Sequence, residues 1–185
     1  MLSWEYDEYI RSHIENLMSK LPNGCKVYIL HIADVEYINL RENKIHQGLA
    51  TDIKTNLHVI TSVFSSLGDY ARAISRIKYE VFDFDIIHAH DWMSGIPSII
   101  AKLAYIKPFV LTFYRLGAKN NDKNLISLSI EGFERYSCNQ ADALILHDKG
   151  LRKYIFEAYG IPWEKIYVTP EWDGIVDIYK EVLEK

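Results

Sequence analysis

Two histidines and one carboxylate stand close together near the middle of the chain. His88, His90 and Asp91 follow a mainly apolar run at residues 84–87 and precede a helical pattern. Because side chains alternate along a strand, His88 and His90 point to one face and the residues between them point to the other. Ligands of layered α/β proteins collect outside the carboxyl ends of the strands. The spacing therefore predicts a candidate site at the end of a strand over residues 85–90.

The role of Asp91 depends on where the next helix begins. With Asp91 as the N-cap, Pro97 lies past the first turn, where its ring clashes with a carbonyl of the preceding turn. With Ser94 as the N-cap, Pro97 falls among the first positions, whose N–H groups lack helical partners. We therefore predict a helix over residues 94–105 and place Asp91 and Trp92 in the connecting loop, free for a ligand. In the alternative interpretation, the two histidines are satisfied core residues and Asp91 only shapes a turn.

Strand-like and helix-like segments alternate along the whole chain. Strands are predicted at residues 1–4, 26–33, 35–40, 57–63, 85–90, 108–114, 141–147 and 165–169. Helices are predicted at residues 7–21, 68–81, 94–105, 125–138, 151–159 and 175–183, and a polar loop is predicted at residues 41–56. This alternation predicts an α/β fold, with a single Rossmann-like parallel sheet and helices on both of its faces.

Composition limits the classes of protein to which this chain can belong. Its 185 residues are enough for one domain with a real core, and 49% hydrophobic with 25% charged residues is ordinary globular usage. The formal net charge is -4 and no basic patch occurs, so we expect no nucleic-acid partner. Tyrosine is abundant and only two glutamines, Gln47 and Gln140, are present, which favours a thermophilic source.

The cysteines and the first residues indicate the compartment. Cys25 and Cys138 cannot form a disulfide framework and lack metal-type spacing, so we expect a reduced, cytoplasmic setting. The first residues include Glu5, Asp7 and Glu8, which is unlike a signal peptide. Since no apolar run is long enough to span a bilayer, we expect no membrane association.

The central motif and several other segments resemble one family. The segment His-Ala-His-Asp-Trp-Met-Ser-Gly-Ile-Pro at residues 88–97 resembles the signature of glycogen and starch synthases and related two-domain retaining glycosyltransferases of GT-B fold. The segment Leu-Ser-Trp-Glu-Tyr at residues 2–6 resembles the first strand of that family, and residues 129–136 resemble its following helix. Residues 141–145 and 159–166 resemble the end of its first domain, so the likeness covers nearly the whole chain.

The resemblance implies the N-terminal, acceptor-side half of such an enzyme. In the family this half holds the acceptor glucan, and a second half, which has no counterpart in these residues, holds most of the nucleotide-sugar donor. Asp91 matches the aspartate that lies beside the sugar in the cleft, and it is the candidate catalytic residue. Its task would be to accept sugar hydroxyls or to stabilise positive charge developing at the anomeric carbon.

The chain departs from the family at the motifs that handle the donor. The family has a glycine-rich loop after its first strand, where backbone N–H groups approach the donor diphosphate. Here acidic residues 7–8 follow that strand and the first glycine is Gly24. A cleft histidine of the family is replaced by Tyr114, which cannot act as a near-neutral acid or base. The family's Pro-Asn-Gly entry to its second half reads Pro-Glu-Trp-Asp-Gly at residues 170–174.

Three functions are compatible with these residues. The first is a non-catalytic relative, inactive as an isolated chain, that binds a glucan, a sugar nucleotide or a protein partner. The second is the acceptor half of a split glucosyltransferase that acts with a separate donor-binding chain. The third is a metal-dependent hydrolase using His88, His90 and Asp91. The third is disfavoured by comparison with metallo-hydrolase motifs of the His-x-His-x-Asp-His type. Here Asp91 follows His90 directly, and Trp92 occupies the position at which such a motif has a further histidine. We therefore expect no metal and no cofactor.

Beside Asp91, four residues are candidates for contact with a substrate. His90 lies on the same strand end, Trp92 and Tyr114 offer rings that stack on a sugar, and Arg115 can reach a sugar or a phosphate. For each of the four the alternative is a packing or solvent-exposed role without function.

The last predicted helix carries an apolar stripe. Its members are Ile175, Ile178, Tyr179, Val182 and Leu183. We predict a domain over residues 1–174 and a C-terminal helix over residues 175–185 that packs back on it. An apolar face left exposed near the candidate site would be buried by a homodimer or by a donor-domain partner.

Overall fold

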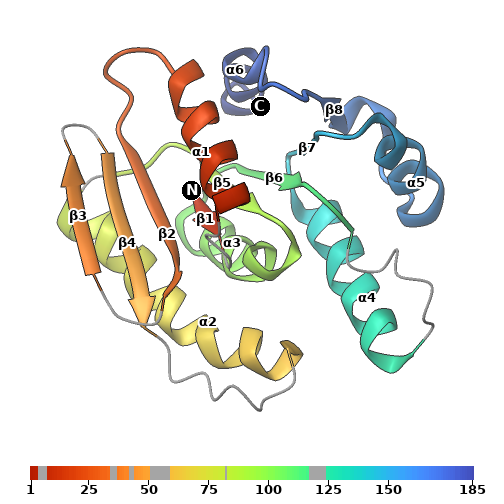
Figure 1. Ribbon diagram of the computed structural model, residues 1–185, viewed down its shortest axis with the longest axis horizontal. Helices are drawn as coiled ribbons and strands as arrows, with labels where there is room; N and C mark the ends of the chain where they lie inside the picture. Colours follow the sequence, from red (N-terminus) through yellow and green to blue (C-terminus); the bar gives the residue numbers. More distant parts are fainter. Residues whose placement is uncertain (4–7, 34–36, 42–43, 51–58, 82, 117–123) are drawn as a thin grey trace.

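A computed structural model describes residues 1–3, 8–33, 37–41, 44–50, 59–81, 83–116 and 124–185 (Figure 1). Its strands are β1 (Leu2–Ser3), β2 (Val27–Ala33), β3 (Tyr37–Arg41), β4 (Lys44–Ala50), β5 (Ile87–His90), β6 (Phe109–Phe113), β7 (Ala143–Leu146) and β8 (Ile166–Val168). Its α-helices are α1 (Glu8–Lys20), α2 (Val59–Arg76), α3 (Trp92–Tyr105), α4 (Leu125–Gln140), α5 (Lys149–Tyr159) and α6 (Ile175–Leu183). A π-helical turn, Ile77–Val81, extends α2, and a 3₁₀ turn, Trp163–Lys165, precedes β8.

The strands form one sheet with the order β3-β4-β2-β1-β5-β6-β7-β8. All neighbours are parallel except β3 and β4, which pair antiparallel at one edge. The predicted α/β fold with a Rossmann-like parallel sheet is therefore confirmed. None of the described helices is long and apolar enough to cross a bilayer.

The two faces of the sheet have separate cores because side chains alternate along each strand. Val27 and Ile29 of β2 pack with α1 and α6 on one face, whereas Tyr28 and Leu30 pack on the other face with residues of α2, α3, α4 and α5. On the first face, the buried residues of α6 are Ile175, Ile178 and Val182. The predicted division of the chain into residues 1–174 and 175–185 stays a prediction.

Two elements away from the candidate site differ from the sequence-based prediction. The predicted loop at residues 41–56 contains β4, which pairs along its whole length with β2, and Gln47 in β4 accepts a hydrogen bond of 2.6 Å from the hydroxyl of Tyr28. The polar composition of β4 predicted a loop, but its polar residue Gln47 is buried and has a hydrogen-bond partner inside the fold. Residues 42–43 and 51–56 of that predicted loop lie outside the described residues.

The predicted strand at residues 57–63 is wrong for the residues that the structure describes. Residues 59–63 begin α2, nine residues before the predicted helix start. The β-branched side chains of this segment favour a strand locally. The residues buried further along α2 are Ser66, Tyr70, Ala73 and Ile74, a helical spacing, so packing of the whole helix overrides the local preference.

Candidate functional site

The two histidines of β5 lie on the same face of the sheet, as predicted. The rings of His88 and His90 stack with centroids 4.4 Å apart, whereas Ile87 and Ala89 belong to the core on the opposite face. Strand β5 lies between β1 and β6 in the middle of the sheet, so the pair occupies its centre. The alternation argument therefore predicted this part of the site correctly.

His88 of β5 forms hydrogen bonds with residues of α6 and β6. Its Nδ1 lies 2.6 Å from the hydroxyl of Tyr179 on α6, and its Nε2 lies 2.7 Å from Oγ1 of Thr112 on β6. Burial lowers the pKa of His88 well below its usual value, so the imidazole is neutral near pH 7. A neutral imidazole donates from one nitrogen and accepts at the other, so both partners are matched. His88 is thus a structural histidine.

His90 is buried beneath Tyr114. Nδ1 of His90 lies 2.8 Å from the Tyr114 hydroxyl, and the two rings are nearly parallel with centroids 5.8 Å apart. Nε2 of His90 is buried and, among the described residues, has no hydrogen-bond partner. Burial, followed by the charge of Asp91, raises the pKa of Tyr114 well above its usual value. The hydroxyl of Tyr114 is therefore neutral and directed at His90.

Asp91 occupies a strained backbone position at the end of β5. Its φ of 62° and ψ of 170° lie in a region that residues with side chains rarely adopt. The backbone N–H of Asp91 donates to the carbonyl of Thr112 at 2.8 Å, and one carboxylate oxygen accepts the backbone N–H of Tyr114 at 3.1 Å. These bonds hold the half-buried carboxylate at the sheet edge. A strained polar residue at this edge marks a candidate functional position.

The prediction that the helix begins near Ser94 is wrong. Helix α3 begins at Trp92, with Asp91 at the N-cap position but without a side-chain capping bond. The hydroxyl of Ser94 donates to the carbonyl of His90 at 2.6 Å and joins the strand end to the first turn of the helix. Pro97 is accommodated inside the helix, where it is buried. The argument from Pro97 assumed that a proline past the first turn excludes the helix, whereas here the helix tolerates the loss of one backbone hydrogen bond.

Trp92 accordingly does not lie in a loop. Its side chain is only 6% exposed, and its ring stacks on Phe133 of α4 with centroids 6.0 Å apart. The expectation that Trp92 is free for a ligand is corrected: the ring packs in the core beside the edge. Arg115, in contrast, is exposed next to Tyr114.

Three further rings belong to the cluster, and the sequence did not single them out. His147 follows β7, and its ring stacks on Tyr114 with centroids 5.1 Å apart. His13 of α1 lies 4.8 Å from Tyr114 and 4.7 Å from His147 between ring centroids. Trp172 is fully buried, and its ring meets His147 edge-on at 4.5 Å. His147 could have been found, because β7 ends beside β6 in a parallel sheet; His13 and Trp172 carried no such signal.

The cluster is electrically neutral near pH 7. Burial lowers the pKa of each of the histidines that form it, namely His13, His88, His90 and His147. Neutral imidazoles and aromatic faces suit hydroxyl-rich, uncharged ligands better than phosphates, which need cationic or N–H-rich sites. Within the described part of the chain no group of His, Cys, Asp or Glu side chains converges as metal ligands do.

Comparison with known proteins supports a glycosyltransferase relationship. The family model described as Glycosyltransferase Family 4 matches residues 12–171. No curated protein sequence matches the chain significantly.

Solved structures show the same fold. One chain of sucrose-phosphate synthase from Thermosynechococcus elongatus superimposes with a TM-score of 0.70 at 11% identity, covering 100% of this chain and 97% of that one. A second structure of that enzyme gives a TM-score of 0.67 at 14% identity, covering 88% of this chain and 41% of that one. UDP-N-acetylglucosamine 2-epimerase from Rickettsia bellii gives a TM-score of 0.60 at 15% identity, covering 97% of this chain and 46% of that one. The present chain thus spans less than half of the two longer proteins. The expected fold, that of the N-terminal half of a GT-B glycosyltransferase, is confirmed.

Proposed function

This chain belongs to Glycosyltransferase Family 4, and from that membership we propose that it is a glycogen-synthase-like acceptor-side domain. In this proposal the domain binds an α-glucan at the carboxyl edge of β5 and β6 and does not transfer sugar by itself. A sugar nucleotide or a protein partner is the alternative occupant of that edge.

The position of Asp91 is the observation that carries the proposal. Its carboxylate stands at the end of the central strand β5, held by the N–H of Tyr114, on a backbone with a φ of 62° that residues with side chains rarely adopt. A carboxylate accepts hydrogen bonds from sugar hydroxyls, and charge-assisted bonds of this kind are stronger than neutral ones. Exposed Arg115 lies on the same edge and adds donors for the ligand.

The neutral cluster behind Asp91 supports the non-catalytic part of the proposal. His90 and Tyr114 bond to each other, and burial moves the pKa of each away from neutrality. A general acid or base works best with a pKa near the operating pH. These two side chains are therefore poor candidates for proton transfer.

Titration calorimetry with maltooligosaccharides, ADP-glucose and UDP-glucose tests the proposal. We expect saturable binding of the maltooligosaccharide and no glucosyl transfer by the isolated chain when a donor is added. The variant Asp91→Asn keeps the acceptor oxygen for the Tyr114 N–H but removes the charge. It should weaken glucan binding about tenfold, because bonds to charged groups contribute about 1.5–3 kcal/mol.

A matched control uses the exposed carboxylate of Asp177 on α6, whose side chain is 81% exposed. Asp177→Asn should bind the glucan as the unchanged chain does. Binding of nucleotide sugars without the glucan would contradict the assignment of the acceptor. Elongation of the oligosaccharide by the chain alone would contradict the non-catalytic role.

One observation favours a second candidate, the acceptor half of a split glucosyltransferase. Helix α4 begins after the carboxyl end of β6, and its first residues Leu125 and Leu128 are 83% and 53% exposed. Phe64 of α2 is 51% exposed and contacts Phe133 of α4 edge-on. Exposed apolar side chains on α4 and α2 suit contact with a second protein.

Reconstitution tests this second candidate. The chain would be mixed with separately expressed donor-binding domains of glucosyltransferases, and transfer to a maltooligosaccharide would be measured. Leu125→Glu with Leu128→Glu should abolish transfer and copurification, whereas Leu103→Glu on α3 should not. Copurification that survives the double substitution would contradict this surface as the contact.

A further inference from the structure

The carboxyl edge of the sheet carries a row of polar and aromatic side chains that extends well beyond Asp91. Strands β5, β6, β7 and β8 are neighbours in this order (Figure 1). The residues that follow them are, in the same order, Asp91, Tyr114, His147 and, three positions after β8, Glu171. Because neighbouring strands lie about 4.8 Å apart, the row spans about 14 Å. This length exceeds what a contact with one sugar unit at Asp91 requires.

Helix α1 lies against the middle of the row and adds two rings to it. His13 lies 4.8 Å from Tyr114 and 4.7 Å from His147 between ring centroids. Tyr9, one helical turn before His13, meets the ring of His13 edge-on at 4.5 Å and the ring of Tyr114 edge-on at 5.8 Å. Two rings thus orient Tyr9, although this residue is 55% exposed. An exposed ring held at a fixed angle suits stacking, because a ligand that covers it immobilises little.

Glu171 places a second carboxylate at the far end of the row. The residue is exposed, and its charge opposes the larger effect of burial, which lowers the pKa of His13 and of His147. Both imidazoles are therefore neutral near pH 7, and a neutral imidazole has one donor and one acceptor nitrogen. The row thus consists of uncharged rings with a carboxylate at each end, Asp91 after β5 and Glu171 after β8.

We propose that this row is an extended acceptor subsite that takes at least two adjacent sugar units of a neutral glucan. The proposal rests on the proposed function and adds two ligand contacts to it, Tyr9 and Glu171, with His13 as the residue that positions Tyr9. One unit lies at Asp91, the next stacks on the ring of Tyr9, and Glu171 accepts hydrogen bonds from hydroxyls further along the glucan. A pyranose ring has C–H groups on its faces and hydroxyls at its rim, which fits an aromatic ring flanked by carboxylates.

The charges of the row distinguish a glucan from a nucleotide sugar. A diphosphate lying along the row would meet a carboxylate at either end, and like charges repel. Proteins bind phosphates with cationic side chains or with clustered backbone N–H groups. A neutral oligosaccharide meets no such repulsion. The subsite should therefore bind maltotriose more tightly than ADP-glucose.

NMR titration of the full chain with glucose, maltose and maltotriose tests the subsite, because it measures weak and tight binding alike. The affinity should rise about tenfold from glucose to maltotriose, as the longer ligand gains the ring of Tyr9. Tyr9→Leu keeps an apolar side chain but removes the flat ring. It should weaken maltotriose binding about tenfold and leave glucose binding unchanged. Tyr9→Phe keeps the ring and should bind both sugars as the unchanged chain does.

A substitution of Glu171 tests the far end of the row independently. Glu171→Gln keeps the size of the side chain and removes its charge, so it should weaken maltotriose binding about threefold and leave glucose binding unchanged. The matched control is Glu164→Gln, an exposed position in the 3₁₀ turn before β8. The control for Tyr9 is Tyr79→Leu, because Tyr79 is 76% exposed on the π-helical extension of α2 and meets Tyr105 edge-on. Both controls should bind the sugars normally.

The outcomes separate this proposal from the one on which it rests. If the unchanged chain binds no maltotriose, the glucan assignment is wrong and the subsite falls with it. Equal affinities for glucose and maltotriose, both weakened by Asp91→Asn, would leave the proposed function standing and overturn the extended subsite. Normal maltotriose binding by Tyr9→Leu or by Glu171→Gln would overturn the role given to that residue. Tighter binding of ADP-glucose than of maltotriose would overturn the preference for a neutral chain.

Discussion

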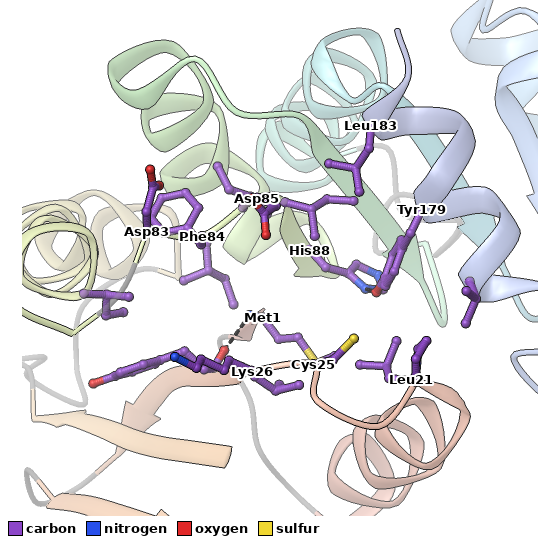
Figure 2. Close-up of a pocket in the computed structure, with 18 of the residues that line it drawn as sticks. Met1, Leu21, Cys25, Lys26, Asp83, Phe84, Asp85, His88, Tyr179 and Leu183 are labelled. Atoms are coloured by element: carbon purple, nitrogen blue, oxygen red, sulfur yellow. Dashed lines mark hydrogen bonds between the residues drawn. The ribbon is translucent and has the colours of Figure 1, made fainter. Parts of the chain in front are cut away.

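The Nδ1 atom of His88 lies 2.6 Å from the hydroxyl oxygen of Tyr179, although 91 residues separate the two in the chain. Figure 2 shows the two side chains meeting at the wall of a pocket. This bond connects the central strand β5 to the C-terminal helix α6.

Removal of the Tyr179 hydroxyl should therefore destabilise the fold. Tyr179→Phe keeps the ring but leaves a buried nitrogen of His88 without its partner, a loss of about 1–3 kcal/mol. The free energy of unfolding in urea measures the effect. Tyr136→Phe on α4 is the control: its side chain is 50% exposed, and the change should stay within about 0.5 kcal/mol. An equal effect of the two substitutions would contradict the role of the buried bond.

Stability should fall as the pH drops below the ordinary pKa of histidine. Burial lowers the pKa of His88 and His90 in the folded chain, so below pH about 6.5 the unfolded chain binds protons that the folded chain does not. Their stabilisation is complete above that pH and is lost progressively below it. Each group contributes a slope of up to about 1.4 kcal/mol per pH unit.

The variant His90→Asn isolates the contribution of one histidine. Urea unfolding between pH 7.5 and pH 5.5 should show a shallower loss of stability in the variant than in the unchanged chain. The window lies above the range in which most carboxylates titrate. Parallel pH profiles for the two proteins would contradict a neutral, buried His90.

The sequence was most informative where one local pattern determines the structure. Alternation placed His88 and His90 on one face, and apolar runs located β5, β6 and β7. Local patterns failed where partners far along the chain decide the outcome. Strand β4 is polar but pairs on both sides, and the start of α2 has strand propensity but belongs to a long helix.

The same limit applies to the site. Asp91 and Tyr114 were singled out because each stands at a strand end and matches a position of the family that the sequence resembles, and their contact with a substrate stays a prediction. Trp172 and His13 reach the cluster from the segment after β8 and from α1, so only the tertiary arrangement brings their rings together. Trp92 was misplaced because the local argument about Pro97 could not weigh the stacking of the ring on Phe133.

Close packing of two helices makes Gly95 sensitive to substitution. A Cβ atom at Gly95 in α3 would lie 2.6 Å from Oγ and 2.9 Å from Cβ of Ser137 in α4. Because Ser137 is fully buried, it cannot move aside, and Gly95→Ala should destabilise the fold by about 1–3 kcal/mol. Gly132→Ala in α4 meets no atom within 4 Å and should stabilise the helix by about 0.5–1 kcal/mol. Thermal unfolding of both variants should give Tm changes of opposite sign.

The strain at Asp91 can be measured by comparing two substitutions. Asp91→Ala and Asp91→Gly both remove the bond to the N–H of Tyr114, but only glycine adopts a φ of 62° with ψ of 170° easily. The glycine variant should therefore be more stable than the alanine variant by about 1–3 kcal/mol. Both should lose glucan binding. Equal stabilities would show that the backbone at this edge is unstrained and would weaken the case for a functional residue there.

Trp172 anchors the segment that leads into α6. The ring is fully buried against His147, and its backbone N–H donates to the carbonyl of Thr169. Trp172→Ala removes the largest fully buried side chain of the described residues and should cost about 3–5 kcal/mol. Trp163→Ala is the control, because that ring is 44% exposed and contacts Arg152, a contact of about 0.5–1 kcal/mol, and the edge of Phe156. Limited proteolysis gives an independent measurement: cleavage after Gly174 should be slow in the unchanged chain and fast in Trp172→Ala. If the unchanged chain loses residues 175–185 rapidly while the remainder stays folded, α6 does not pack stably on the domain, and the bond between His88 and Tyr179 cannot have the role assigned to it.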